Sequence, residues 1–205
     1  MVPPQALDLI RGLRIPFSTN VERVALAAGY KGVEIDWIDI DPDDRSRVVE
    51  ASGQPLVPVL LVGDEAISDS PQILDWLEEH FPQPPLLPAD PARRAEVRVF
   101  VDWFNQVWKR FPNAINDGAG DAAEPAAEMR RAVETFEALL AGRNFLFGDF
   151  GLADVTAFPF LKYASLGLQS GDVDSFHAVL VEQMRLRPDS PLHPWVARID
   201  AYPRG

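Results

Sequence analysis

The sequence contains no cysteine among its 205 residues. Structural disulfides, thiolate metal sites and a cysteine nucleophile are therefore excluded. Long apolar runs are also missing, and no stretch approaches the roughly 20 residues that a membrane-spanning helix needs. The first residues lack the basic segment and the apolar core of a signal peptide, so we expect a cytoplasmic protein that does not enter a membrane.

Positive charge is scarce, because 19 lysines and arginines face 31 acidic residues and the net charge is −12. A chain of this charge is a poor partner for nucleic acid or for an anionic membrane surface. His80, His177 and His193 are far apart and lack ligand spacing, so we expect no metal site. The acidic segment 39–44 lacks the glycine and glutamate offsets of a calcium loop, which favours a solvated acidic turn.

The remaining composition is ordinary for a globular chain, with 47% hydrophobic and 24% charged residues. Such a length is enough for one large domain or two small ones. Segment 82–88 carries four prolines in seven residues, and such a stretch is extended and semi-rigid. We therefore predict a first domain at 1–81, a linker at 82–89 and a second domain at 90–205.

The first half is predicted to be organised around segment 57–70. Val57–Val62 is a short apolar run with the character of a buried strand, and Gly63-Asp64 predicts a tight turn into an antiparallel partner. Ser68, Asp69 and Ser70 offer helix-capping oxygens before Pro71.

Pro58 is unusual in such a strand, because proline removes a ladder donor. A cis Val57–Pro58 bond would explain it and would create a cleft suited to a small peptide-like ligand. An edge-strand proline beside an ordinary helix cap is the alternative interpretation.

Around this segment the patterns predict an alternation of strands and helices. A strand at 6–10 with an exit loop at 11–14 precedes a helix that starts with the Thr19–Glu22 capping box and ends at Gly29. A second strand at 33–37 and a short helix within 41–52 follow.

The second half is predicted to be entirely helical. A stripe of apolar and aromatic residues runs through 90–111 until Pro112 stops the helix. Further helices are expected at 125–140, 152–166, 175–186 and 195–201. The helix at 152–166 is the most apolar, so we expect it at the centre.

Four motifs occur in register along most of the chain: Ile15-Pro16-Phe17-Ser18, Leu56-Val57-Pro58-Val59-Leu60, Ile67 to Leu77, and Phe147 to Val155. With a βαβ-ββα first half, a proline-rich linker and a helical second half, the chain resembles the cytosolic glutathione S-transferases. The resemblance implies an α+β thioredoxin-like domain followed by an all-α domain. It also implies a homodimer.

The resemblance assigns roles to individual residues. Glutathione would be the substrate, and its thiolate would be conjugated to small apolar electrophiles. The implied glutathione-binding residues are Phe17, Val57, Pro58, Asp69 and Ser70. The implied second-substrate pocket contains Ile15, Trp103, Phe104 and Trp108. Aromatic residues on a helical stripe are more often core, which is the alternative for Phe104; Trp103 lies off the stripe and suits a cleft or a subunit interface.

The chain departs from the family pattern at two positions. Ile15 stands directly before Pro-Phe, where the family usually has a catalytic serine or cysteine. Ser18 is the nearest hydroxyl, and it is either the thiolate donor or only a helix cap. If Ser18 is only a cap, either backbone N–H groups stabilise the thiolate alone, or the chain is a non-catalytic binding or interaction protein with this fold. Gly151 replaces the usual Ser or Thr cap of the buried helix, while Asp154 keeps its capping spacing, a role in folding and not in chemistry.

Overall fold

The computed structural model describes residues 9–118 and 120–205. The chain folds into two compact units, of which the second is Leu86–Ala201. The first reaches to Pro85 and also includes Tyr202–Gly205. The division falls inside the proline-rich segment, and the return of the last four residues to the first unit was not indicated by the sequence.

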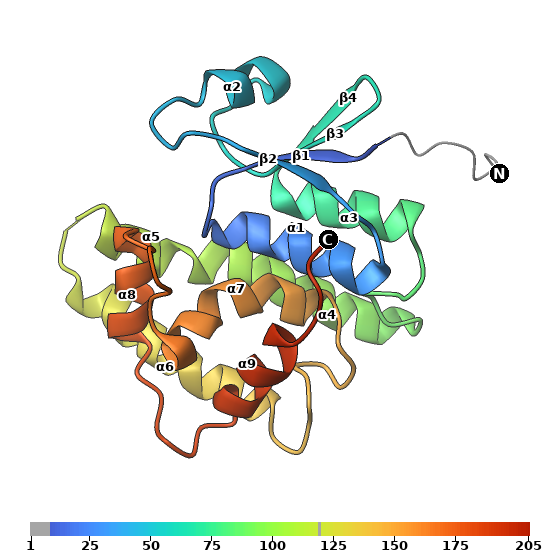
Figure 1. Ribbon diagram of the computed structural model, residues 1–205. Coiled ribbons are helices and arrows are strands. Elements are labelled where there is room, and N and C mark those ends of the chain that lie inside the picture. The colour runs from blue at the N-terminus through green and yellow to red at the C-terminus, as the bar shows by residue number, and fades with distance from the viewer. Residues whose placement is uncertain (1–8, 119) are drawn as a thin grey trace. The chain divides into compact units, whose positions relative to one another are not determined.

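The first unit is a small mixed sheet covered by helices (Figure 1). Its elements are β1 (Arg11–Arg14), α1 (Thr19–Lys31), β2 (Asp36–Asp39), α2 (Ser46–Ser52), β3 (Val59–Val62), β4 (Glu65–Ser68) and α3 (Ser70–His80). The strand order is β2-β1-β3-β4, in which β1 is parallel to β2 and antiparallel to β3, and β3 is antiparallel to β4. Helices α1 and α3 lie on one side of the sheet and α2 lies on the other, which is the predicted thioredoxin-like arrangement.

The strand–turn–strand–helix prediction for segment 57–80 is confirmed. β3 and β4 form an antiparallel pair on either side of Gly63-Asp64, with Val62 opposite Glu65. The Val57–Pro58 bond is cis. Helix α3 starts at Ser70 with proline in its first turn.

The first strand lies later in the chain than predicted. Residues 6–8 are outside the described part, residues 9–10 are not strand, and the predicted exit loop is β1 itself. The buried side chain of β1 is Leu13, which packs in a core cluster with Val59. Gly12 falls in the predicted exit loop, but it lies inside β1, where a Cβ would lie 2.5 Å from the ring of Trp37. Glycine is therefore needed inside the strand because the indole of Trp37 lies against it. The second strand also starts later than predicted, since β2 begins at Asp36 and not at residue 33.

Helix α1 also differs from its prediction at both ends. Ser18, and not Thr19, is its N-cap, and Gly32 with φ 69° ends it instead of Gly29. Gly29 lies inside the helix, where a Cβ would lie 2.2 Å from the carbonyl oxygen of Pro203. The C-terminal segment 202–205 therefore packs directly on α1.

Hydrogen bonds hold this C-terminal segment in place. The N–H of Gly205 donates to the carbonyl of Ala25 at 2.9 Å, and the indole of Trp37 donates to the carbonyl of Gly205 at 2.6 Å. Arg204 pairs with Glu22 at 2.9 Å. The segment thus ties α1 to β2.

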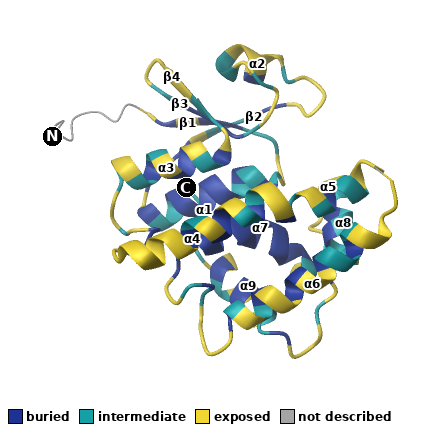
Figure 2. Cartoon of the chain, turned by 180° about the vertical axis from the view of Figure 1, so that it is seen from behind, coloured by how far each residue is buried: buried dark blue, intermediate teal, exposed yellow. Residues whose placement is uncertain are grey.

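The second unit is entirely helical in its described part. Its elements are α4 (Pro91–Trp103), a π-helical turn η1 (Phe104–Trp108), α5 (Arg110–Asn116), α6 (Ala123–Leu139), α7 (Leu152–Leu166), α8 (Ser175–Gln183) and α9 (Leu192–Asp200). The predicted stop at Pro112 is wrong, because Pro112 lies in the first turn of α5, where its missing N–H costs nothing. Helix α7 has the predicted bounds, and Figure 2 shows it as buried.

The start of α7 explains why glycine replaces the usual cap residue. A Cβ at Gly151 would lie 2.6 Å from the carbonyl oxygen of Leu86, which accepts a hydrogen bond from the N–H of Leu152 at 2.7 Å. Asp154 provides the other half of the cap, since its carboxylate accepts from the N–H groups of Gly151 and Leu146 and from the indole of Trp195 at 2.8–3.1 Å. Its predicted role in folding is confirmed.

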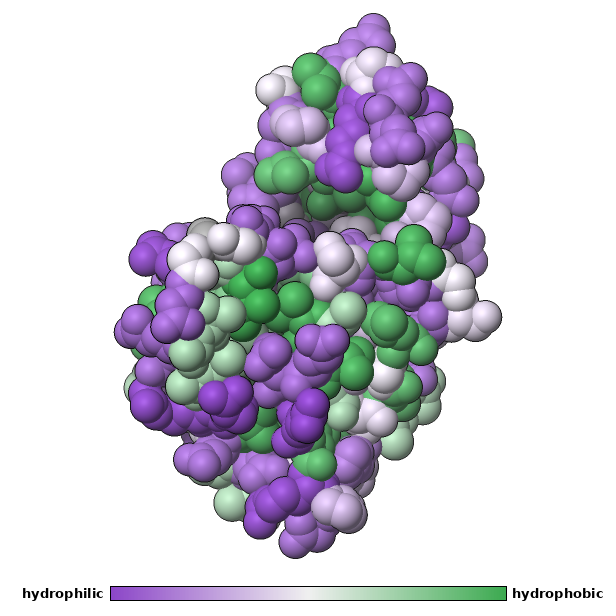
Figure 3. All heavy atoms as spheres, turned by 90° about the vertical axis from the view of Figure 1, so that its left-hand side faces the viewer, coloured by the Kyte–Doolittle hydropathy of each residue, from purple (hydrophilic) through white to green (hydrophobic). Residues whose placement is uncertain are grey.

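Figure 3 shows one face of the protein, on which hydrophobic residues lie between polar ones. Among the described residues, no helix combines the length and apolarity needed to cross a membrane.

We expect Gly29→Ala to destabilise the protein, although alanine is about 1 kcal/mol better than glycine inside a helix. The added methyl group meets the backbone of Pro203, and overpacking costs about 1–3 kcal/mol. Urea unfolding measures the change. In a control chain that ends at Ala201, the same substitution is expected to stabilise. A stabilising Gly29→Ala in the chain that retains residues 202–205 contradicts the packing described.

We expect Asp154→Asn to lower the free energy of unfolding by about 1–3 kcal/mol, because an amide cannot accept all three hydrogen bonds. Burial raises the pKa of Asp154 to about 6, although the hydrogen bonds from Leu146, Trp195 and Gly151 act in the opposite direction. The native carboxyl therefore holds its proton more tightly than the unfolded one, and its contribution to stability is lost as pH rises through about 6. Urea unfolding at pH 5 and pH 7 should show the larger difference between the two proteins at pH 5. A larger difference at pH 7 contradicts the raised pKa.

Candidate functional site

The N-terminus of α1 carries the candidate thiolate donor. Ser18 is half-buried at the N-cap, where its Oγ accepts a long 3.5 Å hydrogen bond from the N–H of Val21. Phe17, directly before it, has φ 64° and is 38% exposed. Left-handed backbone is rare for a bulky residue and clusters at functional sites. A hydroxyl at the positive end of a helix dipole can stabilise an anion such as a thiolate.

A cavity of about 260 Å³ adjoins this helix end, entirely within the first unit. Ile15, Phe17 and Ser18 line it from the loop before α1, and Val21 and Trp37 line it from α1 and β2. The structure thus brings together three of the residues predicted from the sequence. Because the cavity has both apolar and polar walls, it can hold a small organic molecule.

The N-terminus of α3 carries the candidate acidic group. Asp69 is exposed, has φ 72° and occupies the N-cap position, yet its side chain makes no capping hydrogen bond. Ser70 is buried beside it. The Asp69 carboxylate is therefore not used by its own helix, and together with the helix N-terminus it can bind a zwitterionic group.

A partly buried polar network joins the two helix starts. Asn20 Oδ1 accepts hydrogen bonds from Ser70 Oγ at 3.4 Å and from a terminal nitrogen of Arg23 at 3.3 Å. Burial lowers the pKa of Arg23 to about 9, while the charge of Asp69 acts to raise it. Arg23 thus stays positive at neutral pH and attracts Asp69. The Ser70–Asn20 hydrogen bond holds the N-terminal turns of α1 and α3 side by side.

Sequence reasoning missed Asn20 and Arg23. Both lie in the first two turns of α1, three residues apart, and Arg23 is buried. Arg23 lies opposite the apolar stripe of Val21 and Val24 on the helix, so the sequence pattern places it on the exposed face and does not signal its burial.

Val57 and Pro58 precede β3, so the backbone of Val57 lies outside the paired register of the sheet. Val57 is half-buried and Pro58 is buried. The backbone of Val57 is placed where it can bond a peptide-like ligand, and its role stays a prediction.

The aromatic residues predicted for the second-substrate pocket lie in the helical unit. Phe104 and Trp108 have no exposed surface, and their rings stack with centroids 4.4 Å apart. Both also contact Phe136 and Phe160. Both residues therefore lie in the core and not in the second-substrate pocket that the resemblance implied. For Phe104 the core was the alternative interpretation of the aromatic stripe. Trp103 is half-buried, and its ring contacts Phe100 and Phe136.

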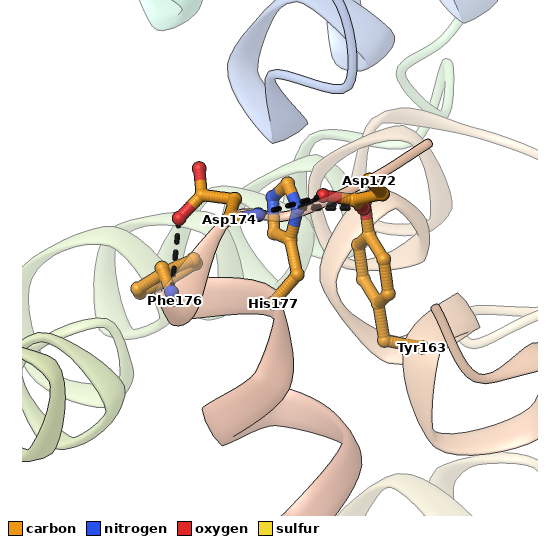
Figure 4. A network of polar contacts seen from close by, with 5 residues as sticks. All are labelled: Tyr163, Asp172, Asp174, Phe176 and His177. Carbon is orange, nitrogen blue, oxygen red and sulfur yellow. Dashed lines mark hydrogen bonds and ion pairs between the residues drawn. The ribbon is translucent and has the colours of Figure 1, made fainter. Parts of the chain in front are cut away.

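A second polar cluster lies in the helical unit (Figure 4). Tyr163 donates its hydroxyl hydrogen to Asp172 at 2.9 Å, and Nδ1 of His177 lies 2.8 Å and 2.9 Å from the two Asp172 oxygens. Burial raises the pKa of Asp172, but hydrogen bonds from His177, the N–H of Asp174 and Tyr163 hold it below its usual value. All three side chains are buried, so this cluster anchors the start of α8 and is closed to a ligand.

No group of three or more histidine or acidic side chains in residues 9–118 and 120–205 is placed to hold a metal ion.

Comparison with known families gives two matches, one in each half of the chain. The family model described as "Glutathione S-transferase, N-terminal domain" matches residues 13–85, and the one described as "Glutathione S-transferase, C-terminal domain" matches residues 122–204. The matched halves carry the thioredoxin-like and helical units described above.

Individual relatives agree with these models. A probable glutathione S-transferase from Solanum tuberosum is 32% identical over 154 residues, which cover 71% of this chain and 68% of the potato protein. A probable glutathione S-transferase from Nicotiana tabacum is 28% identical over 69% of this chain, and the chain spans 65% of its length, just under two thirds.

Solved structures show the same fold. The Tau class glutathione S-transferase from mango, Mangifera indica, superimposes with a TM-score of 0.76 at 20% identity, over 97% of this chain and 91% of the mango chain. Rice GST1, solved in complex with glutathione, has a TM-score of 0.69 at 25% identity, over 88% of this chain and 86% of its own. This protein belongs to the glutathione S-transferase family.

Proposed function

We propose that the protein binds glutathione at the adjoining N-termini of α1 and α3 and conjugates its thiolate to small apolar electrophiles. The observation that carries the proposal is the Ser70–Asn20 hydrogen bond of 3.4 Å. It holds the start of α3, which carries Asp69, beside the start of α1, which carries Ser18, and this supports a site for a short peptide with an ammonium group at one end and a thiol at its middle.

Each part of glutathione has a chemically matched group in the first unit. The γ-glutamyl ammonium pairs with Asp69, and the neighbouring carboxylate takes the N–H groups at the start of α3, since helix N-termini bind anions. The cysteinyl backbone takes the main chain of Val57 beside Pro58. Phe17 borders the thiol. The rice relative, solved in complex with glutathione, supports this ligand.

The chemistry needs only a stabilised thiolate. Lowering a thiol pKa by about two units requires roughly 2.7 kcal/mol. A hydrogen bond from Ser18 to the charged sulfur contributes about 1.5–3 kcal/mol, and the helix end contributes about 0.3–1 kcal/mol. The thiol proton leaves to solvent. The sulfur then forms a bond to the electrophilic carbon, and the leaving group departs with its electron pair, so no covalent enzyme intermediate forms.

Ile15 favours a second candidate function, a non-catalytic binding protein that keeps the glutathione site. It stands where the family usually places the catalytic hydroxyl or thiol, and it lines the cavity beside Ser18. In the catalytic reading, Ile15 instead supplies apolar surface to the second substrate. A homodimer is also proposed, on the family alone.

Asp69→Asn tests the peptide site, because asparagine tolerates the left-handed backbone and removes only the charge. We expect the Kd for reduced glutathione, measured by titration calorimetry, to rise about 10–100-fold, as losing a charged hydrogen bond implies. Asp64→Asn, in the exposed turn between β3 and β4, is the matched control and should bind as the parent does. Equal affinity in all three proteins, or no heat with millimolar glutathione, overturns the site.

Ser18→Ala tests the thiolate donor. We expect kcat/KM with glutathione and 1-chloro-2,4-dinitrobenzene to fall about 10–100-fold, with activity recovering at higher pH because the bound thiol regains a more ordinary pKa. Ser18→Thr keeps a hydroxyl and should retain most activity. If Ser18→Ala matches the parent at every pH, Ser18 is only a helix cap. A parent that binds glutathione without turnover supports the non-catalytic candidate.

A further inference from the structure

The cavity beside α1 uses a different face of that helix from the glutathione site proposed above. Val21 and Ala25 face the cavity, whereas Asn20 and Arg23 belong to the network with Ser70. Its volume of about 260 Å³ is just below the range of about 300–1,000 Å³ for ligand pockets. A ligand of one substituted ring therefore fits this space better than a peptide does.

The walls of the cavity suit a flat apolar ring. Ile15 and Phe17 line it from the loop, and the Trp37 ring lines it from β2. The Trp37 indole is fixed by its hydrogen bond to the carbonyl of Gly205. Phe17 is held partly exposed with φ 64°, so the backbone keeps an aromatic ring at the cavity and not in the core. Such surfaces stack favourably on aromatic ligands.

The two arginines on the cavity wall, Arg204 and Arg14, differ in how their charges are paired. Arg204 is matched to Glu22, since its Nε and Nη2 both lie 2.9 Å from the same carboxylate oxygen. Arg14 forms an ion pair through its Nε, which lies 2.6 Å from an Asp39 carboxylate oxygen, and the two side chains are 39% and 61% exposed. Exposed pairs of this kind contribute little, so Arg14 can accept a competing anion at low cost.

The position of Arg14 also favours a particular anion. Its guanidinium carbon lies 5.8 Å from the centre of the Trp37 ring, which holds the guanidinium beside the apolar wall. A guanidinium fork matches a carboxylate through two parallel hydrogen bonds. A carboxylate directly attached to an aromatic ring satisfies both requirements at once.

We propose that this cavity binds small aromatic carboxylates, with the carboxylate on the terminal nitrogens of Arg14 and the ring against Phe17 and Trp37. Because Ser18 borders the same cavity, aromatic acids are also the proposed class of second substrate, and this extension rests on the proposed transferase function. Binding of the aromatic acid does not depend on the transferase function.

Calorimetric titration with 4-nitrobenzoate and 4-nitrobenzamide, without any thiol, tests the cavity. The two probes differ in the carboxylate, and we expect the benzoate to bind at least about 10-fold more tightly. Arg14→Gln should remove that preference while leaving benzamide binding unchanged. Arg14→Lys should restore only part of it, because an ammonium group lacks the fork. Arg11→Gln, an exposed position on the same strand, is the matched control. Thermal unfolding confirms that each variant is folded.

Equal binding of the two probes, undiminished benzoate binding in Arg14→Gln, or no binding at millimolar probe overturns the proposal. The result is separable from glutathione binding. If the protein binds benzoate through Arg14 but does not bind glutathione, the proposed transferase function is wrong and the proposed cavity ligand is supported. If it binds glutathione but not benzoate, the glutathione site is supported and the proposed cavity ligand is wrong.

Discussion

The candidate site depends on a constraint of sheet topology. Strands β1 and β4 are each antiparallel to β3, so they run in the same direction. The helices that follow them, α1 and α3, must therefore begin at the same end of the strands. This constraint brings Ser18 and Asp69, 51 residues apart in sequence, to neighbouring helix ends. Two positive helix termini in one place form a natural anion site.

A partly buried polar network keeps those termini together. Two aligned helix dipoles repel at their ends, and Asn20 and Asp69 supply the acceptor and the negative charge that offset this repulsion. Arg23 links them, as a cation buried in the unit but attracted to Asp69. A buried charge is tolerated only when it is matched, so the network ties the stability of the unit to the geometry of its site.

The strand pair and helix of segment 57–80 and most helices of the second unit could be predicted, because their signals are local. Gly12 and Gly29 lie inside β1 and α1 and not in the predicted loop and at the predicted helix end, whereas Gly151 is the N-cap of α7 as predicted. At each of the three a distant group approaches the backbone: Trp37, Pro203 and Leu86, respectively. A glycine in a sequence shows that space is needed and not what fills it. The bounds of β1 and α1 were wrong for this reason.

The site was predictable to the extent that family motifs mark it. Ser18, Phe17, Asp69 and Ser70 are named by local patterns, and two of them, Phe17 and Ser18, line one cavity. Asn20 and Arg23 were missed because their function depends on a contact between α1 and α3 that no local pattern contains. Phe104 and Trp108 show the reverse case, because a helical aromatic stripe cannot separate core from pocket until its neighbours Phe136 and Phe160 are known.

A crystal structure of the protein with bound glutathione tests the central claim most directly. The account predicts the γ-glutamyl ammonium on the Asp69 carboxylate and the sulfur within hydrogen-bond reach of the Ser18 hydroxyl, with the Asn20–Ser70 contact intact. Glutathione bound away from the two helix starts, or bound there with its sulfur beyond the reach of Ser18, contradicts it.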